Sequence, residues 1–304
     1  PDPAFAVRNP GFEETHNGRF TGFNFHDQPG EVSFIDTEVS HGGSTSLRME
    51  NFTANEHGHG RVMQEIDVRP HRCYRVSMWV KTENLQSERS FAIQVLAGSR
   101  SLVPDNARVE STGDWKKYSM IFNSMEFDQV RIYAGMWGGK SGKFWVDDWS
   151  LEEMGPINVL RRPGTPVTIT SDDGSITYEE GKDYAHVEDP NYTPYWIDRP
   201  APAVKILPGS RIVEGQTLRA DWYHSLAINS GQISVCMGEP ELYKIYDEEA
   251  ALLAKHINPK RVLLNMDEVR MGGTCEACRG RNMGELIGEC VTRQSEIIHK
   301  YIPA

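Results

Sequence analysis

The chain has 304 residues, more than one hydrophobic core usually organises, so at least two domains are expected. Its 43 acidic and 32 basic residues give a net charge of −11, which disfavours binding to nucleic acid through the phosphate backbone. The chain contains no apolar run of about 18 residues, the length that a membrane-spanning helix needs, so no membrane span is expected.

Residues 1–152 are predicted to form an all-β domain, because short alternating runs are separated by Gly, Asn and Asp turns. In residues 73–81, for example, Val76, Met78 and Val80 alternate with residues suited to the opposite side of a strand. Eight such runs are found, at residues 30–37, 45–50, 61–68, 73–81, 90–98, 115–122, 128–137 and 143–153. We expect a two-sheet sandwich with Trp115 and Trp145 in its core.

The opposite side of three of these strands carries aromatic and polar side chains. They are Arg75, Trp79, Gln94, Arg131, Tyr133 and Trp137. An aromatic plane stacks against the apolar side of a pyranose, while amide and guanidinium groups bond hydroxyls. We therefore predict a sugar-binding groove, with Trp79, Gln94, Arg131, Tyr133 and Trp137 as substrate-binding residues. The alternative is a set of ordinary solvent-facing residues, or tryptophans covered by another segment.

Residues 153–210 are rich in Pro and Gly, which predicts a β-hairpin linker subdomain without a core of its own. Residues 211–304 then alternate between a strand at 216–224, a helix at 240–257, a strand at 261–266 and a helix at 284–302. This order is typical of a parallel sheet. A closed barrel of such units needs about 250 residues, so we expect a partial (β/α), TIM-barrel-like domain that another segment or chain completes.

Two acids, Asp267 and Glu268, follow the apolar run directly. Functional groups gather at the carboxyl ends of parallel strands, and glycoside cleavage needs an acid with a second group to meet the developing charge. In this interpretation Glu268 is the acid, Asp267 raises its pKa or orients the substrate, and Arg270 binds a hydroxyl or carboxylate. The alternative is a pair of acids that cap a helix.

The end of an earlier strand supplies Asp221 and His224, which we expect to line the same cleft as the acid pair. Cys275 and Cys278 have the spacing of half a zinc site. Cys290 or Cys236 could complete a cluster. Because this is a single Cys-x-x-Cys and Cys290 is expected to be buried as a small apolar group, zinc is not expected.

Five segments of the first domain occur in a characteristic order: RNPGFEE at 8–14, HGGSTSLRM at 41–49, YRVSMWVKT at 74–82, GDWKKYSMIF at 113–122 and FWVDDWSLEE at 144–153. Together they resemble the galactose-binding-like jelly rolls that serve as carbohydrate-binding modules beside glycoside hydrolases. This resemblance implies a structural calcium ion held by Glu13 with Asp147 or Asp148, with carbonyls from residues 43–46 completing the shell. The alternative is that Asp147 and Asp148 end a strand at the surface.

The stretch MDEVRMGG at 266–273 resembles the β-hexosaminidase-type clan, although the histidine and glycines that usually precede the acid pair are replaced. More broadly, residues 166–184 and 265–289 are similar to large bacterial barrel proteins classed as glycoside hydrolases. These resemblances imply a glycoside hydrolase whose catalytic residues are Glu268 and Asp267.

The sequence thus predicts a secreted or periplasmic carbohydrate-active protein in three parts: a β-sandwich at 1–152 that binds an oligosaccharide or polysaccharide, a linker at 153–210, and a partial α/β domain at 211–304 that hydrolyses glycosidic bonds. Two alternatives remain open. One is a carbohydrate-binding protein without activity, and the other is a metal-dependent hydrolase that uses His224 and the cysteines.

Overall fold

A computed structural model describes residues 5–103, 107–193, 200–224, 235–264, 269, 272–273 and 275–303. The chain divides into two compact units. Unit 1 consists of Pro1–Ile157 with Trp196–Ala201, and unit 2 of Asn158–Tyr195 with Pro202–Ala304.

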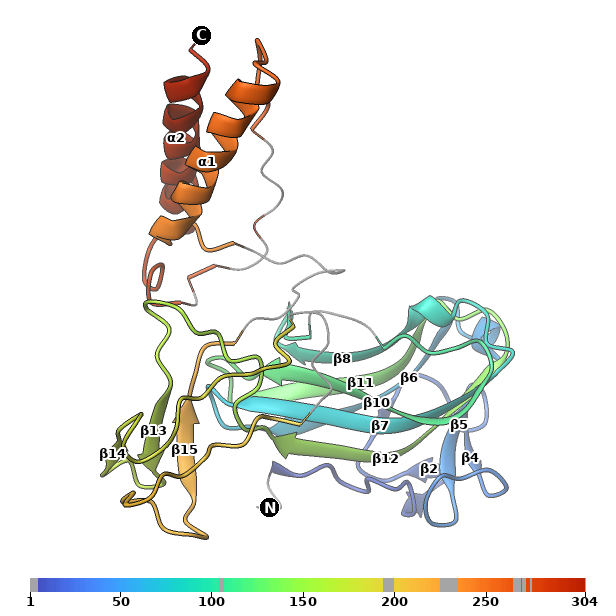
Figure 1. The fold of residues 1–304 in the computed structure, drawn as a ribbon. Coiled ribbons are helices and arrows are strands. Elements are labelled where there is room, and N and C mark those ends of the chain that lie inside the picture. Colours follow the sequence, from blue (N-terminus) through green and yellow to red (C-terminus); the bar gives the residue numbers. More distant parts are fainter. Residues whose placement is uncertain are drawn as a thin grey trace. The chain divides into compact units, whose positions relative to one another are not determined.

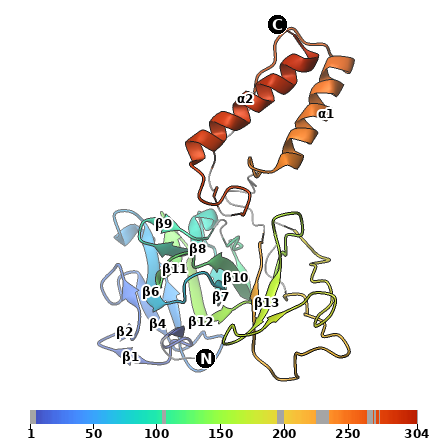
Figure 2. The same cartoon turned by 90° about the vertical axis from the view of Figure 1, so that its left-hand side faces the viewer.

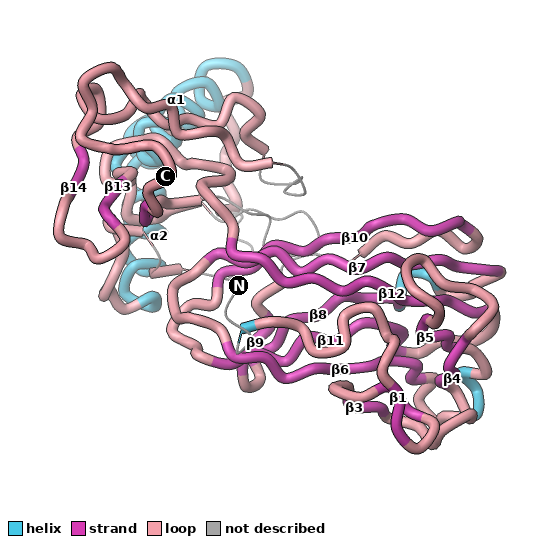
Figure 3. The backbone as a smooth tube through the Cα atoms, turned by 90° about the horizontal axis from the view of Figure 1, so that it is seen from below, coloured by secondary structure: helices cyan, strands magenta, loops and turns pink. Residues whose placement is uncertain are grey.

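Unit 1 is a sandwich of two five-stranded antiparallel sheets, which lie as stacked layers (Figures 1 and 3). The first sheet has the order β10 (Gly113–Asn123), β7 (Cys73–Glu83), β12 (Lys143–Glu153), β5 (Ser46–Met49) and β4 (Ser33–Asp36). The second has the order β3 (Asn24–Phe25), β6 (His59–Asp67), β11 (Gln129–Trp137), β8 (Phe91–Ala97) and β9 (Arg100–Ser101). From β5 onward the long strands alternate between the two sheets, as in a jelly roll.

The sandwich forms because each long strand places every second side chain in one shared core. Five phenylalanines with no exposed surface occupy that core: Phe12, Phe52, Phe91, Phe122 and Phe144. All eight predicted strands are confirmed. The structure adds a hairpin of β1 (Thr15–His16) and β2 (Arg19–Phe20), the short strands β3 and β9, and the 3₁₀ turns η2 (Phe52–Ala54) and η3 (Glu88–Ser90).

Unit 2 contains a small antiparallel sheet, in which β13 (Thr168–Ser171) lies between β14 (Thr177–Tyr178) and β15 (Leu218–Asp221). Seven buried side chains pack around it: Val159, Val167, Ile169, Tyr178, Tyr184, Val187 and Ile212. The expectation that the linker region has no core of its own is therefore wrong. The apolar residues that build this core are spread over more than 50 positions, so no short window reveals them.

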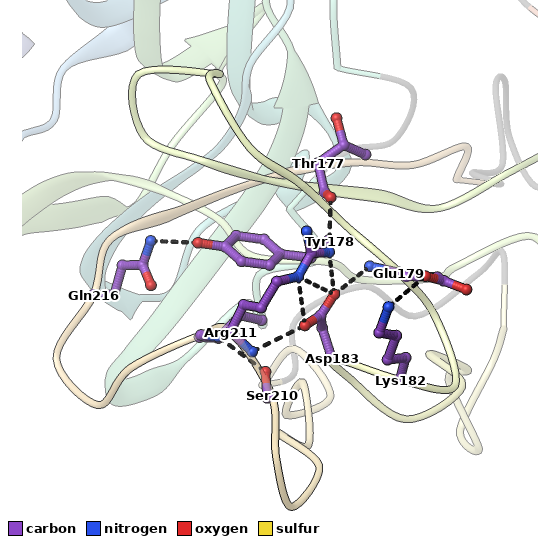
Figure 4. A network of polar contacts seen from close by, with 9 residues as sticks. Thr177, Tyr178, Glu179, Lys182, Asp183, Ser210, Arg211 and Gln216 are labelled. Carbon is purple, nitrogen blue, oxygen red and sulfur yellow. Dashed lines mark hydrogen bonds and ion pairs between the residues drawn. The ribbon is translucent and has the colours of Figure 1, made fainter.

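An ion pair between the buried Asp183 and the half-exposed Arg211 closes the loops around this small core (Figure 4). The carboxylate of Asp183 has no exposed surface and accepts hydrogen bonds from the Glu179 amide at 2.8 Å, the Arg211 amide at 2.9 Å and the Arg211 Nε at 3.1 Å. The Arg211 guanidinium also donates to the carbonyl of Thr177. These hydrogen bonds from Arg211 hold the pKa of Asp183 well below its usual range.

The two helices of unit 2 are α1 (Pro240–His256) and α2 (Met283–Tyr301), which lie side by side (Figure 2). Pro240 occupies the first turn of α1, where its missing N–H costs nothing. Asn282 caps α2 by accepting hydrogen bonds from the amides of Gly284 and Glu285. Both predicted helices are confirmed, and so is the strand predicted at 216–224, as β15.

A partial (β/α) barrel is not evident in the described part of unit 2. Its one sheet is antiparallel, and residues 261–264 of the predicted strand at 261–266 are not part of a strand. Leu263 is 89% exposed. An apolar run is buried only where neighbouring strands cover it, and the described residues provide none here. Among the described residues, neither helix is apolar enough over its length to cross a membrane.

We expect Asp183→Asn to lower the melting temperature of unit 2 by about 5 °C or more at neutral pH. The buried Asp183 carboxylate accepts hydrogen bonds from Arg211 and from two backbone amides, and an Asn amide would place a donor against these donors. The folded-state pKa of Asp183 is depressed. Its stabilising contribution is therefore complete above the unfolded pKa of about 3.9 and is lost as the pH falls below it. Thermal melts followed by circular dichroism should show wild type and variant converging in acid.

Glu179→Gln is the matched control, since the Glu179 carboxylate forms an exposed ion pair with Lys182 at 3.4 Å and should change the melting temperature little. Equal melting temperatures for wild type and Asp183→Asn at pH 7 would contradict the stabilising role.

Candidate functional site

The outward side of β11 carries a cluster of aromatic and polar side chains. Val130, Ile132, Ala134 and Met136 of this strand point into the core, so the intervening residues point outward. Pairing with β6 and β8 places Tyr133 opposite Met63 and Gln94. Gly135 lies opposite Arg61, and a Cβ at Gly135 would lie 2.1 Å from the Gly60 carbonyl oxygen. We call this surface the β11 face, formed by His26, Arg61, Gln94, Arg131, Tyr133 and Trp137.

Contacts between these side chains order the β11 face. The Arg61 guanidinium lies 4.9 Å from the centroid of the Trp137 ring and donates from Nε to His26 Nδ1 at 3.2 Å. The rings of His26 and Tyr133 are parallel within 4°, with centroids 6.4 Å apart, and the Tyr133 and Trp137 centroids are 6.1 Å apart. Arg131 donates to the Tyr133 hydroxyl at 3.4 Å. Aromatic rings and hydrogen-bonding groups therefore occur side by side.

The charge state of the β11 face follows from these contacts. Burial, and then the positive charge of Arg61, lower the pKa of His26. His26 is therefore neutral near pH 7 and accepts a hydrogen bond from Arg61. Tyr133 is 8% exposed, whereas Trp137 is half-buried and offers part of its ring to solvent. Such a surface can stack on an apolar ring plane and bond the polar groups around its rim.

Trp79 and Arg75 do not belong to the β11 face. Both lie on β7, which is part of the other sheet, so the expectation that all six residues share one side is wrong. Trp79 stacks on His41, with ring centroids 3.8 Å apart and an angle of 16°. Arg75 pairs with Glu152 at 3.6 Å. The alternation along a strand tells which residues point together but not which sheet the strand joins.

Trp115 and Trp145 also differ from the prediction that both fill the core. Trp145 is 2% exposed but lies on the outer side of β12, where its Nε1 donates to Asp36 at 2.8 Å. Trp115 is half-exposed and lines a hollow of about 260 Å³ together with Glu110, Lys116 and Tyr118.

His26 and Arg61 were not among the predicted site residues. Arg61 stands in the predicted strand at 61–68, where it alternates with Val62 and therefore belongs on the outer side. The alternation along this strand could therefore have predicted that Arg61 faces outward. The sequence pattern does not show that β6 pairs with β11, which is what brings Arg61 to Trp137.

The acids predicted to hold calcium gather around the loop at 41–45. Glu13 Oε1 accepts from the amides of Ser44 at 2.8 Å and Thr45 at 3.1 Å. Asp148 Oδ2 lies 2.5 Å from His41 Nδ1. Asp147 Oδ2 accepts from the amide of His41 at 2.8 Å. Asp147 is fully buried, so it does not simply end a strand at the surface.

A β-bulge in β12 brings the two aspartates to this loop. The pairing of β12 with β7 shifts between Asp147 and Ser150, and Asp148 has a positive φ of 45°. Trp149 is consequently turned into the core, and its amide donates to the Pro10 carbonyl at 2.8 Å. The bulge thus directs both carboxylates outward while the strand continues.

Carboxylate oxygens, which hard cations prefer as ligands, surround this loop. A Cβ at Gly42 would lie 2.6 Å from Asp148 Oδ2, and one at Gly43 would lie 2.0 Å from Glu13 Oε1, so the carboxylates approach the bare backbone closely. Burial raises the pKa of Asp147 to about 6, a cost that a bound cation would offset. The ligand oxygens of Glu13, Asp147 and Asp148 do not all lie within 4.8 Å of one another. An ion would therefore take two carboxylates and loop carbonyls.

The predicted site residues of unit 2 are only partly described. Asp221 ends β15 and is exposed, and His224 forms a single bridge with Val159. The Nδ1 atom of His224 is buried and has no hydrogen-bond partner among the residues that the structure describes, and burial lowers the pKa of His224 to about 4. Asp267, Glu268 and Arg270 lie outside the described residues, so their convergence with Asp221 and His224 stays a prediction.

Comparisons with known proteins concern unit 1. Residues 5–141 match the model of a family described as a carbohydrate binding domain. No curated protein sequence matches the chain. The family match, together with the two-sheet sandwich, supports a carbohydrate-binding jelly roll in this part of the chain. Neither the comparisons nor the described residues support a glycoside hydrolase barrel.

Three solved structures illustrate the similarity. TmCBM61 in complex with β-1,4-galactotriose is 20% identical, with a TM-score of 0.36, over 48% of this chain and 97% of that one. A cyclase from Fischerella sp. TAU is 16% identical, with a TM-score of 0.38, over 48% and 94%. The xylan-binding domain CBM22-1 of Paenibacillus barcinonensis Xyn10C is 15% identical, with a TM-score of 0.33, over 49% and 93%.

Proposed function

We propose that unit 1 binds an oligosaccharide or polysaccharide on the β11 face. The observation that carries this proposal is the side-by-side placement of Tyr133 and Trp137, 6.1 Å apart, with Gln94 directly opposite Tyr133. Trp137 offers part of its ring to solvent, and the hydroxyl of Tyr133 and the amide of Gln94 supply polar groups on the same surface. The match of residues 5–141 to a carbohydrate binding domain family supports this assignment.

Individual groups have distinct roles in this proposal. The exposed part of Trp137 stacks against the apolar side of a sugar ring, while Arg61 holds the indole from a neighbouring strand. Tyr133 presents its hydroxyl, which Arg131 orients. Gln94 and Arg131 bond ring hydroxyls. Trp79 has no part in this surface, since its ring is stacked on His41 in the other sheet.

We expect Trp137→Ala to weaken glycan binding at least about tenfold, equivalent to about 1.4 kcal/mol, because it removes the exposed stacking plane. Isothermal titration with a panel of β-1,4-linked oligosaccharides, including galactotriose and xylo-oligosaccharides, measures the loss. Trp115→Ala is the matched control, because Trp115 is also half-exposed but lies on the other sheet. Binding that survives Trp137→Ala and is lost in Trp115→Ala would move the site to the hollow at β10.

We also propose a structural calcium ion at the loop of residues 41–45, held by Glu13 with Asp147 or Asp148. When bound, the ion would supply positive charge to the buried Asp147 carboxylate and tie the N-terminal segment to the last strand of the sandwich. The carboxylate oxygens and the close approach of Gly42 and Gly43 support this proposal.

If calcium binds there, EDTA should lower the melting temperature of unit 1 by about 5 °C or more, and added Ca²⁺ should restore it. Glu13→Gln should abolish the calcium response. Glu14→Gln should preserve it, since the Glu14 side chain bonds Thr21 and not the loop. A melting curve that EDTA leaves unchanged argues against the ion.

Hydrolysis of glycosidic bonds by Glu268, with Asp267 and Arg270, is a second proposal, and it rests on the sequence. An acid pair directly after an apolar run is suited to protonating a glycosidic oxygen. As part of the same proposal, the protein is secreted or periplasmic, because polysaccharide substrates are found there.

Glu268→Gln should reduce turnover of a bound polysaccharide by about 100-fold or more, as expected when a general acid is lost. Glu241→Gln, in an exposed ion pair with Lys244 on α1, should leave turnover unchanged. Reducing-sugar release from the glycans that bind provides the measurement. Binding without turnover by the wild-type chain would identify a non-catalytic binding protein, and turnover that a chelator abolishes would favour a metal-dependent hydrolase.

A further inference from the structure

Three cysteines from distant parts of unit 2 come together at the base of its two helices. The Sγ atoms of Cys236 and Cys275 are 3.2 Å apart, those of Cys275 and Cys278 are 3.3 Å apart, and all three lie within 4.8 Å of one another. Cys275 and Cys278 are buried, and Cys236 is half-buried. Among the residues that the structure describes, no other three His, Cys, Asp or Glu ligand atoms converge in this way.

The arrangement suits a shared metal ion better than a disulfide. A disulfide joins two sulfurs at about 2.05 Å, so one of the three would remain unpaired. Zinc binds thiolates tetrahedrally at about 2.3 Å, which places the sulfurs about 3.8 Å apart. A small outward rotation of the three side chains reaches that separation from the observed one. Cysteine thiolates are ligands that zinc prefers among divalent cations.

Two loops position these sulfurs. Cys275 and Cys278 lie in a tight turn, in which the amides of Cys278 and Arg279 donate to the Cys275 carbonyl at 3.1 and 2.8 Å. Cys236 lies in a second turn, where its carbonyl accepts from the Glu239 amide at 3.0 Å. The loops touch at Gly238, because a Cβ there would lie 2.5 Å from the carbonyl oxygen of Ala277. Gly238 is thus needed for the sulfurs to meet.

Burial raises the pKa of the Cys275 thiol to about 12, a cost that a bound cation would offset, and positively polarised groups adjoin the site. Each loop leads directly into a helix, α1 from Pro240 and α2 from Met283, and helix N-termini stabilise thiolates. The Arg162 side chain lies beside Cys236 and forms an ion pair with Glu239 at 3.2 Å. A guanidinium at this place offsets the net negative charge of one divalent ion with three thiolates.

The fourth cysteine of the chain's C-terminal region, Cys290, provides an internal contrast. Cys290 belongs to the same apolar cluster, with Met237 and Leu286, but its sulfur contacts Gln294 and is not part of the converging group. Among the described residues of this cluster, Met237 and Leu286 are the only large apolar side chains that are buried, and the others are partly exposed. Small cores of this kind commonly depend on a metal or a disulfide for stability.

We propose that Cys236, Cys275 and Cys278 bind one Zn²⁺ as thiolates, with water in the fourth position, and so join the loops that precede α1 and α2. Three thiols lose three protons to solvent as three zinc–sulfur bonds form, and no sulfur changes oxidation state. The sequence led us to expect no zinc because a single Cys-x-x-Cys supplies two ligands. Cys236, which lies 39 positions before Cys275, supplies the third. This inference does not depend on glycan binding.

The first test measures metal content in the full chain. After purification with zinc and removal of excess metal, elemental analysis should find one zinc per chain. Cys236→Ser, Cys275→Ser and Cys278→Ser should each lose most of it, while the matched control Cys290→Ala should retain it. Less than one tenth of an equivalent in the wild type, or equal loss in Cys290→Ala, would overturn the proposal.

The second test needs no variant and therefore holds even if the serine variants do not fold. Alkylation of the wild-type chain, mapped by peptide mass spectrometry with and without a zinc chelator, should show chelator-dependent labelling at Cys236, Cys275 and Cys278 and not at Cys73 or Cys290. Cobalt substitution should give thiolate-to-metal charge-transfer absorption. A disulfide between any two of the three cysteines in the purified chain, or labelling that the chelator leaves unchanged, would refute zinc binding.

Discussion

The alternation of side chains along each strand of the sandwich is the constraint on which the rest of unit 1 depends. Because β11 and β8 commit every second residue to a core shared with the other sheet, their remaining residues must point outward. The antiparallel registers of β6, β11 and β8 then decide which outward residues meet, and they place Arg61, Tyr133 and Gln94 in adjoining rows. A shift of one position in any of these strands would turn its member of this group toward the core and dismantle the β11 face.

In the same unit, a β-bulge and two glycines bring the acidic side chains near the loop at 41–45 together. A continuous β12 would place Asp147 and Asp148 on opposite sides of the sheet. The bulge places both beside the loop at 41–45 and turns Trp149 into the core. Glycine at positions 42 and 43 lets the backbone approach the carboxylates. Asp147 is therefore buried because the last strand packs against the N-terminal segment. This burial raises the pKa of the Asp147 carboxylate.

Unit 1 is stabilised mainly by burial of apolar side chains, whereas unit 2 also depends on polar contacts and on contacts between sulfur atoms. Its small sheet has a core of seven buried side chains, and the bidentate contact of Arg211 with Asp183 closes the loops beside it. The helix pair rests on a second small cluster that contains the three converging cysteines. Each cluster alone is small, and specific contacts between distant segments are the expected way to fix such elements.

The sequence by itself determined the main strands of the sandwich and both helices, whereas the strand predicted at 261–266 is not formed by its described residues 261–264. Period-2 runs located all eight long strands, and apolar spacing with a proline at position 240 located both helices, because these signals depend on neighbouring residues alone. Only the tertiary structure decided which strands share a sheet, so Trp79 was grouped with Tyr133 although β7 lies in the other layer. It also decided that Cys236 joins Cys275 and Cys278. Pairings between distant segments depend on how the whole chain packs around its hydrophobic cores. A local sequence pattern contains no information about that packing.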